Sequence, residues 1–71
     1  MLTTLQKAGA LALLPKLGTF DCGTVAILFL KEYGESIDHH EFAYYLDELR
    51  SKGLIVQVYS NHDFTQYRLA S

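Results

Sequence analysis

The fold of this chain is decided from residue 37 onward, where the sequence reads Ile37-Asp38-His39-His40-Glu41-Phe42. An aspartate followed three residues later by a glutamate is typical of a helix start, so we expect Asp38 to be the N-cap and Glu41 to cap it in return. Ile37 and Phe42 bracket this start and are expected to pack together as a hydrophobic staple. The pattern therefore predicts a helix over residues 38–52.

The same helix is predicted to end at Gly53, because glycine adopts the left-handed conformation of a helix C-terminus at little cost. Leu54 is expected to fold back on Leu49 in a Schellman-type stop. Phe42, Leu46 and Leu49 share one face at helical spacing, and this face is predicted to be core. The opposite, outward face carries His40, Tyr44, Asp47, Glu48 and Ser51.

Two β-rich runs follow, at residues 54–59 and 64–69, and they flank the turn-forming residues Ser60-Asn61-His62-Asp63. We expect an antiparallel hairpin with a four-residue loop. On its outward face, the predicted pairs are Tyr59 with Phe64, Gln57 with Gln66, and Ile55 with Arg68. The other face is predicted to pack on the helices, and it carries Leu54, Val56, Val58, Thr65, Tyr67 and Leu69. A shift of one residue would exchange the two faces.

A first helix is predicted over residues 3–13, because Thr3 and Gln6 have the spacing of a capping box and Pro15 disfavours continuation. A second helix is predicted over residues 21–33.

The second helix is expected to be capped by either Thr19 or Asp21 and stopped by Gly34. Its middle, Val25-Ala26-Ile27-Leu28-Phe29-Leu30, leaves no polar face across nearly two turns. A helix of this kind is buried on most sides. We therefore expect it either at the domain centre or partly against a second copy of the chain.

The length and composition predict one domain, residues 1–71, with a small core. A single cysteine, Cys22, excludes an internal disulfide, so the cytoplasm is the expected compartment. The longest apolar run is far shorter than the roughly 20 residues that span a bilayer, and no membrane contact is expected. The sequence has no phosphate loop, nucleophile elbow or metal-ligand spacing. We expect a non-enzyme without cofactors or a small-molecule substrate.

The order of helix, helix, short extended segment, helix and hairpin resembles the winged helix-turn-helix superfamily. Residues 38–53 correspond to the recognition helix, residues 34–37 to the turn and residues 54–69 to the wing. The resemblance implies an α+β fold that is mainly α, with three helices followed by a two-stranded antiparallel hairpin. It also implies that the extended segment 35–37 pairs with the wing. Members usually bind DNA, with the recognition helix in the major groove and the wing against the backbone or minor groove.

The charges depart from this pattern. The recognition-like helix carries four acidic and two basic side chains, a net charge of −2 on the element that should approach phosphates. A typical DNA site uses about 6–10 phosphate contacts. The whole chain holds six lysines and arginines, so one copy cannot supply these contacts from one face. A homodimer joined through the first and second helices would double the basic residues and pair two recognition helices.

Two hypotheses follow. The first is a small transcription-regulator type of protein that binds double-stranded DNA as a dimer. In it, bases face His40, Tyr44 and Ser51, and phosphates lie near Lys52, Gln57, Gln66 and Arg68. The second is a protein-interaction module on a winged-helix scaffold that binds no DNA and contacts a partner protein through Tyr44, Asp47, Tyr59 and Phe64. The fold favours the first hypothesis and the charges favour the second.

Other residues have simpler interpretations. His39 and His40 point about 100° apart on a helix and are not expected to chelate one ion together. Cys22 lies near a helix N-terminus, where the dipole lowers a thiol pKa, but we expect it to act as a small apolar side chain. Of the adjacent pair Tyr44 and Tyr45, only one is expected in the core.

Overall fold

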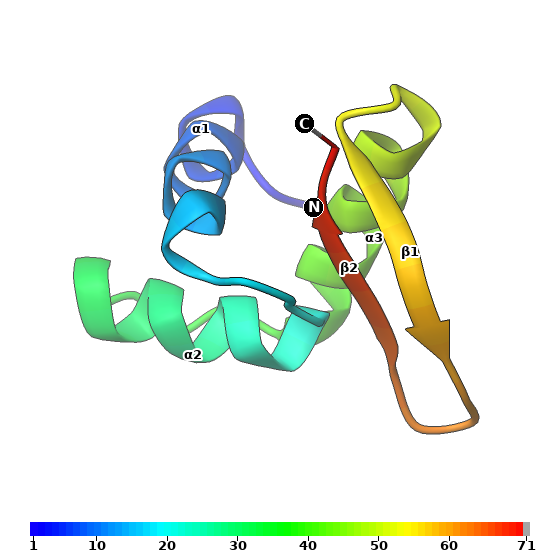
Figure 1. Ribbon diagram of the computed structural model, residues 1–71. Helices are drawn as coiled ribbons and strands as arrows, with labels where there is room; N and C mark the ends of the chain where they lie inside the picture. Colours follow the sequence, from blue (N-terminus) through cyan, green and yellow to red (C-terminus); the bar gives the residue numbers. More distant parts are fainter. Residues whose placement is uncertain (71) are drawn as a thin grey trace.

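The computed structural model describes residues 1–70 and contains three α-helices followed by a two-stranded antiparallel hairpin (Figure 1). The first helix is extended by η1 (Leu14–Lys16), one turn of 3₁₀ helix. The helices and strands are α1 (Thr4–Leu13), α2 (Cys22–Tyr33), α3 (His39–Ser51), β1 (Ile55–Ser60) and β2 (Thr65–Leu69). This is the winged-helix architecture, mainly α, that the sequence predicts.

The predicted caps of the first two helices are confirmed. The main-chain N–H of Gln6 donates to Thr3 Oγ1 (3.1 Å), and the N–H of Thr3 donates to Gln6 Oε1 (2.9 Å), which completes a capping box. At the start of α2, the N–H of Thr24 donates to Asp21 Oδ1 (2.7 Å), so Asp21 is the cap and not Thr19. Gly34 ends α2 in the left-handed conformation, with φ of 69°.

The third helix begins and ends where the sequence predicts, but its start is capped differently. Asp38 Oδ1 accepts from the N–H of His40 (3.0 Å). The Glu41 carboxylate does not return the cap; it pairs with the Met1 ammonium (2.7 Å). At the other end Gly53 has φ of 77°, and the N–H of Leu54 donates to the carbonyl of Leu49 (3.0 Å), as a Schellman stop requires.

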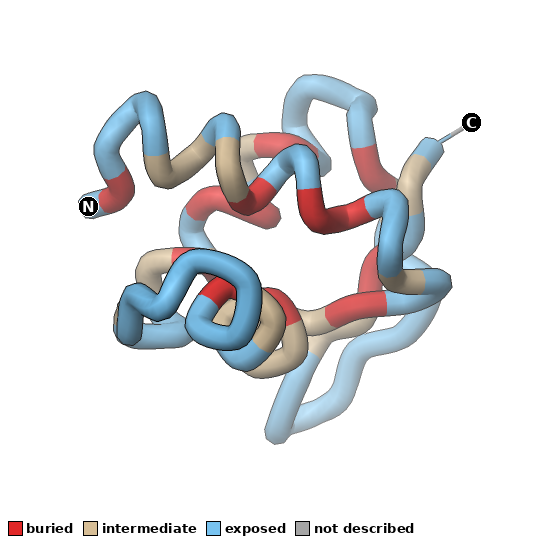
Figure 2. The backbone as a smooth tube through the Cα atoms, turned by 90° about the vertical axis from the view of Figure 1, so that its left-hand side faces the viewer, coloured by how far each residue is buried: buried red, intermediate tan, exposed pale blue. Residues whose placement is uncertain are grey.

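The core lies between the three helices and the hairpin, and in Figure 2 the buried stretches of backbone face one another around the centre of the molecule. Phe42 is fully buried, and its ring centroid lies 5.3 Å from that of Phe29 on α2. Burying one large apolar side chain contributes about 1.5–3 kcal/mol. The buried residues are Leu2, Ala10, Leu13, Leu14, Phe20, Val25, Phe29, Phe42, Tyr45, Leu46, Leu49, Ile55 and Tyr67.

The predicted register of the hairpin is wrong. The structure pairs Ile55 with Leu69, Val56 with Arg68, Gln57 with Tyr67, Tyr59 with Gln66 and Ser60 with Thr65. None of the predicted pairs, Tyr59–Phe64, Gln57–Gln66 or Ile55–Arg68, is in the ladder. The ladder shifts by one residue between Gln57 and Tyr59, as in a β-bulge that leaves Val58 without a partner.

The loop explains part of this shift. It occupies residues 61–64, because Asn61 Oδ1 accepts from the N–H groups of Asp63 (2.8 Å) and Phe64 (3.0 Å) and so closes the turn one residue later than predicted. As a result Ile55, predicted to face outward, is fully buried, and Val58, predicted to face the helices, is 44% exposed. Tyr67 does face the helices, as predicted.

The wing is tied to the helices by a residue that the sequence analysis did not assign to the sheet. Phe20, in the loop before α2, forms an antiparallel bridge with Tyr67 of β2. The segment 35–37, predicted to pair with the wing, is not in a strand. The expected pairing with the wing is therefore present as a single bridge, and it comes from a residue before α2 rather than from the segment after it.

Candidate nucleic-acid interface

The outward face of α3 carries a row of exposed polar and aromatic side chains, which we call the α3 row. His40, Tyr44, Asp47 and Ser51 recur every three or four residues and are all exposed. Tyr44 is 76% exposed and its neighbour Tyr45 only 7%, so one tyrosine lies outside and one in the core, as predicted. The row exists because Phe42, Leu46 and the other core residues of α3 hold the opposite side of the helix against the core.

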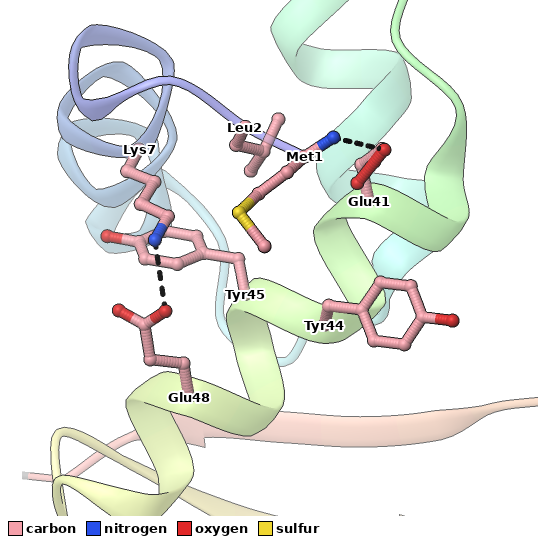
Figure 3. A pocket seen from close by; sticks show the side chains of 7 residues that line it. All are labelled: Met1, Leu2, Lys7, Glu41, Tyr44, Tyr45 and Glu48. Carbon is pink, nitrogen blue, oxygen red and sulfur yellow. Dashed lines mark hydrogen bonds and ion pairs between the residues drawn. The ribbon is translucent and has the colours of Figure 1, made fainter.

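Glu48, predicted to belong to this row, instead turns toward α1 (Figure 3). Its Oε1 lies 3.1 Å from Lys7 Nζ, and its Oε2 lies 3.2 Å from Lys52 Nζ. Hydrogen bonds from these two lysines hold the pKa of the Glu48 carboxyl below its usual value. Tyr44 points away from this cluster, whereas Tyr45 lies beneath the Lys7 ammonium, with 5.7 Å between the nitrogen and the ring centroid.

Most of the carboxylates at the start of α3 and along it therefore already have a partner within the fold. The Asp38 carboxylate caps the helix, and the hydrogen bond from the His40 amide, followed by that with the His40 ring, lowers its pKa. Glu41 and Glu48 each pair with a cation from outside α3. Asp47 alone among the four carboxylates has no ion pair with any of residues 1–70.

The wing brings together only some of its predicted contact residues. Gln66 and Arg68 alternate with Tyr67 along β2 and so share its outward face, where Arg68 is exposed. Gln57 pairs with Tyr67 and lies on the other face, although it is exposed. Lys52, at the end of α3, is held by Glu48.

Two aromatic side chains mark the tip of the wing. The ring centroids of Tyr59 and Phe64 lie 5.7 Å apart, although the two residues are not paired in the ladder. Tyr59 is 51% exposed and Phe64 37%. Beside them, a hollow of about 260 Å³ separates the wing loop from α3; its lining includes Cys22, Ala43, Leu46, His62 and Phe64.

Arg50 is a candidate that sequence reasoning missed. It lies on α3 outside the predicted row, is exposed, and has no ion pair within residues 1–70. Burial raises the pKa of the Tyr67 phenol, the Asp47 carboxylate raises it further, and Arg50 opposes this. The charges of Asp47 and Arg50 on α3 therefore both act on the Tyr67 phenol of β2. Only the position of the hairpin on α3 reveals this, because helical periodicity alone does not.

The structure bears on two expectations about isolated residues. His39 and His40 do not point apart: their ring centroids lie 4.3 Å from each other, and both rings approach Asp38 Oδ1. One ligand atom from each of the three side chains lies within 4.8 Å of the others, but all three residues are exposed. Burial, followed by the charge of Asp21, raises the pKa of the Cys22 thiol, which argues against the reactive interpretation.

A second surface of interest is apolar and lies on α1 and α2. The prediction that α2 is buried on most sides is wrong for the single chain, since Ile27 is 71% exposed and Leu30 is 47% exposed. Leu5 on α1 is 83% exposed. Between the two helices lies a hollow of about 370 Å³, whose lining includes Leu5 and Tyr33. We call these residues, Leu5, Ile27, Leu30 and Tyr33, the α1–α2 face.

None of the helices within residues 1–70 is long and apolar enough to cross a bilayer.

The fold and the exposed α3 row define a winged-helix protein, and solved structures of the same fold are similar to it. The complex structure of hsRosR-S1 superimposes with a TM-score of 0.77 at 26% sequence identity over 99% of this chain and 61% of that chain. The structure of H. salinarum RosR grown from NaBr gives 0.75 at 26% identity over 97% and 61%. RosR is a winged-helix transcription regulator. This chain thus spans about three fifths of the RosR chains.

No protein-family model and no curated protein sequence matches this chain.

Proposed function

We propose that this chain is a small, non-catalytic regulator that binds double-stranded DNA as a homodimer in the cytoplasm. The observation that carries the proposal is the placement of the exposed α3 row beside a wing that the Phe20–Tyr67 bridge holds against the helices. In winged-helix proteins of the DNA-binding kind, a helix in this position enters the major groove. The likeness to RosR supports the same assignment.

In this proposal His40, Tyr44 and Ser51 face base edges. Phosphates lie near Lys52, Gln66 and Arg68. Gln57 and Arg50 are also proposed to approach phosphates. In the sequence, the negative charge of α3 argues against DNA binding. The structure weakens this argument, because Glu48 pairs with Lys7 and Lys52 on the side toward α1. The cations that remain are few, so we expect weak phosphate binding by each protomer and dependence on the dimer.

The second part of the proposal is that two copies join through the α1–α2 face. Exposed apolar side chains on adjacent helices cost free energy in water, and covering them with the same face of a second copy removes that cost. A small domain also gains stability from a shared interface. The symmetric arrangement would present two α3 rows to successive half-sites.

The experiment that tests the proposal is a measurement of duplex affinity against salt concentration, with randomised duplexes and the full chain. A dimer that makes about two or three phosphate contacts for each protomer should give a slope of log K against log salt of roughly −4 to −5. Absence of duplex binding at low salt would overturn the DNA-binding proposal.

A protein partner is the second candidate, and the exposed aromatics favour it. Tyr44, Tyr59 and Phe64 are of the residue types enriched at protein interfaces, and Asp47 near Tyr44 has no ion pair within residues 1–70. This function predicts partner binding that tolerates added salt and no effect on any duplex. Tyr44→Ala and Tyr59→Ala would weaken such binding, whereas Gln66→Ala, a change outside this set, would not.

A further inference from the structure

Asp47 differs from the other carboxylates of α3. Asp38, Glu41 and Glu48 are each engaged by a helix cap or an ion pair. The Asp47 carboxylate is exposed and makes no hydrogen bond or ion pair with any side chain of residues 1–70. Within residues 1–70, the only hydrogen bond of this residue beyond the helix ladder is at its main-chain oxygen, which accepts from Ser51 Oγ (3.0 Å). Its two carboxylate oxygens are therefore available to a partner.

The position of Asp47 is central to the proposed interface. It lies one helical turn from both Tyr44 and Ser51 in the outward row, and its charge acts on the Tyr67 phenol of the wing. A side chain in the middle of this row would face the floor of the major groove in the proposed complex.

The chemistry of the row makes Asp47 its most selective member. Guanine is read by arginine or lysine, and adenine by asparagine or glutamine, whereas a carboxylate accepts from the N4 amino group of cytosine. The outward row, His40, Tyr44, Asp47 and Ser51, contains none of the first four residue types. We propose, on the basis of the proposed DNA-binding function, that Asp47 selects cytosine at one position in each half-site and weakens binding to all other duplexes.

The physical reason is that a carboxylate near phosphates is repelled and must also lose water as it enters the groove. A hydrogen bond from an amino group compensates for this loss. Guanine and thymine present acceptors at the corresponding edge, so they leave the carboxylate without a donor. Adenine offers an amino group next to the N7 acceptor, which repels the second carboxylate oxygen. Cytosine's own edge carries the amino donor and no acceptor, and the nearest acceptor is O6 of the paired guanine.

The test is selection from randomised duplexes followed by sequencing, with the full chain and two variants. Asp47→Asn has almost the same shape but is neutral and can donate as well as accept. It should reduce the preference for cytosine by roughly 5- to 100-fold and shift the position toward adenine, which asparagine reads. It should also bind unselected duplexes several-fold more tightly. Asp63→Asn is the matched control, because it removes the same charge from an exposed wing-loop residue and should leave the cytosine preference unchanged.

The outcomes separate this inference from the proposed function. If Asp47→Asn selects the same cytosine as the unmodified chain, or if the unmodified chain selects no cytosine, the role of Asp47 is overturned while DNA binding stands. If the unmodified chain binds no duplex, the proposed function fails and this inference fails with it. Circular dichroism of both variants checks that the helices are intact.

Discussion

Phe20 and Tyr67 exchange two main-chain hydrogen bonds: the N–H of Phe20 donates to the carbonyl of Tyr67 (2.9 Å), and the N–H of Tyr67 donates to the carbonyl of Phe20 (2.8 Å). The two residues are 47 positions apart in the sequence. Both side chains are buried, so the bridge joins the α1–α2 connection to the wing from inside the core. The orientation of the wing beside α3 depends on this contact.

Loss of the Phe20 side chain should therefore loosen the wing. Phe20→Ala removes a ring that is 1% exposed, and we expect it to lower the free energy of unfolding by about 3–5 kcal/mol. Phe20→Leu, which keeps most of the volume, should cost less than about 1.5 kcal/mol. Urea denaturation measures both, and hydrogen exchange of the Tyr67 amide reports on the bridge. Equal effects of the two variants would contradict the assignment of Phe20 to the core.

Gly53 should resist substitution for reasons of backbone conformation alone. Its φ of 77° is in the left-handed region, and a Cβ built there meets no atom within 4 Å. Gly53→Ala is therefore expected to cost about 1–2 kcal/mol through strain, without a steric clash. Gly18→Ala is the matched control, because Gly18 also has open space and is not in that region, so its stability should change by less than about 0.5 kcal/mol. Thermal unfolding of both variants compares them directly.

Asp38 should make the stability of the fold depend on acidic pH. The His40 amide hydrogen bond keeps its pKa below the usual value. Its stabilising contribution is therefore complete above the unfolded pKa, near pH 4, and is lost as the pH falls through the depressed folded pKa. Asp38→Asn keeps a capping side chain that does not titrate. The Tm of the unmodified chain should fall more steeply below about pH 4 than that of Asp38→Asn, and parallel curves would contradict this role.

Local signals predict the helices of this chain and the row of α3 well. Each helix cap and each glycine stop acts on residues only a few positions away, so the local sequence is enough to predict the helix ends. These residues are Thr3, Asp21, Asp38, Gly34 and Gly53. The 3.6-residue period likewise separates Tyr44 from the core residues of α3.

The hairpin and the charge pattern could not be predicted in the same way. The register depends on where Asn61 closes the turn and on the burial of Ile55 in the core. These two requirements differ by one residue, and the bulge at Val58 takes up the difference. The bridge at Phe20 and the ion pair between Lys7 and Glu48 join residues that are more than 40 positions apart. Such contacts arise from tertiary packing. The sequence alone therefore gives no sign that some of the carboxylates of α3 are paired with cations from outside the helix.

The α1–α2 face provides a test of the proposed dimer. Ile27→Glu places a charge on the α1–α2 face at a side chain that is 71% exposed, and we expect it to weaken self-association at least 10-fold and to leave the helices intact. Light scattering after size-exclusion chromatography should give the mass of two chains for the unmodified protein and of one chain for the variant. Val58→Glu, an equivalent change on the exposed bulge of the wing, should leave the mass of two chains unchanged. A single-chain mass for the unmodified protein would refute the dimer.

Arg68 should contribute to DNA affinity without contributing to sequence preference. Its guanidinium is exposed on the outward face of the wing, and within residues 1–70 its only hydrogen bond is to the neighbouring carbonyl of Leu69 (3.2 Å). A phosphate contact at this site predicts that Arg68→Gln weakens all duplexes to a similar extent and reduces the magnitude of the salt slope by about 1 for each protomer. Arg68→Lys keeps the charge and should keep the slope. A slope that is unchanged in Arg68→Gln would remove the wing from the phosphate-binding surface, because counterion release counts only those cations that reach the backbone.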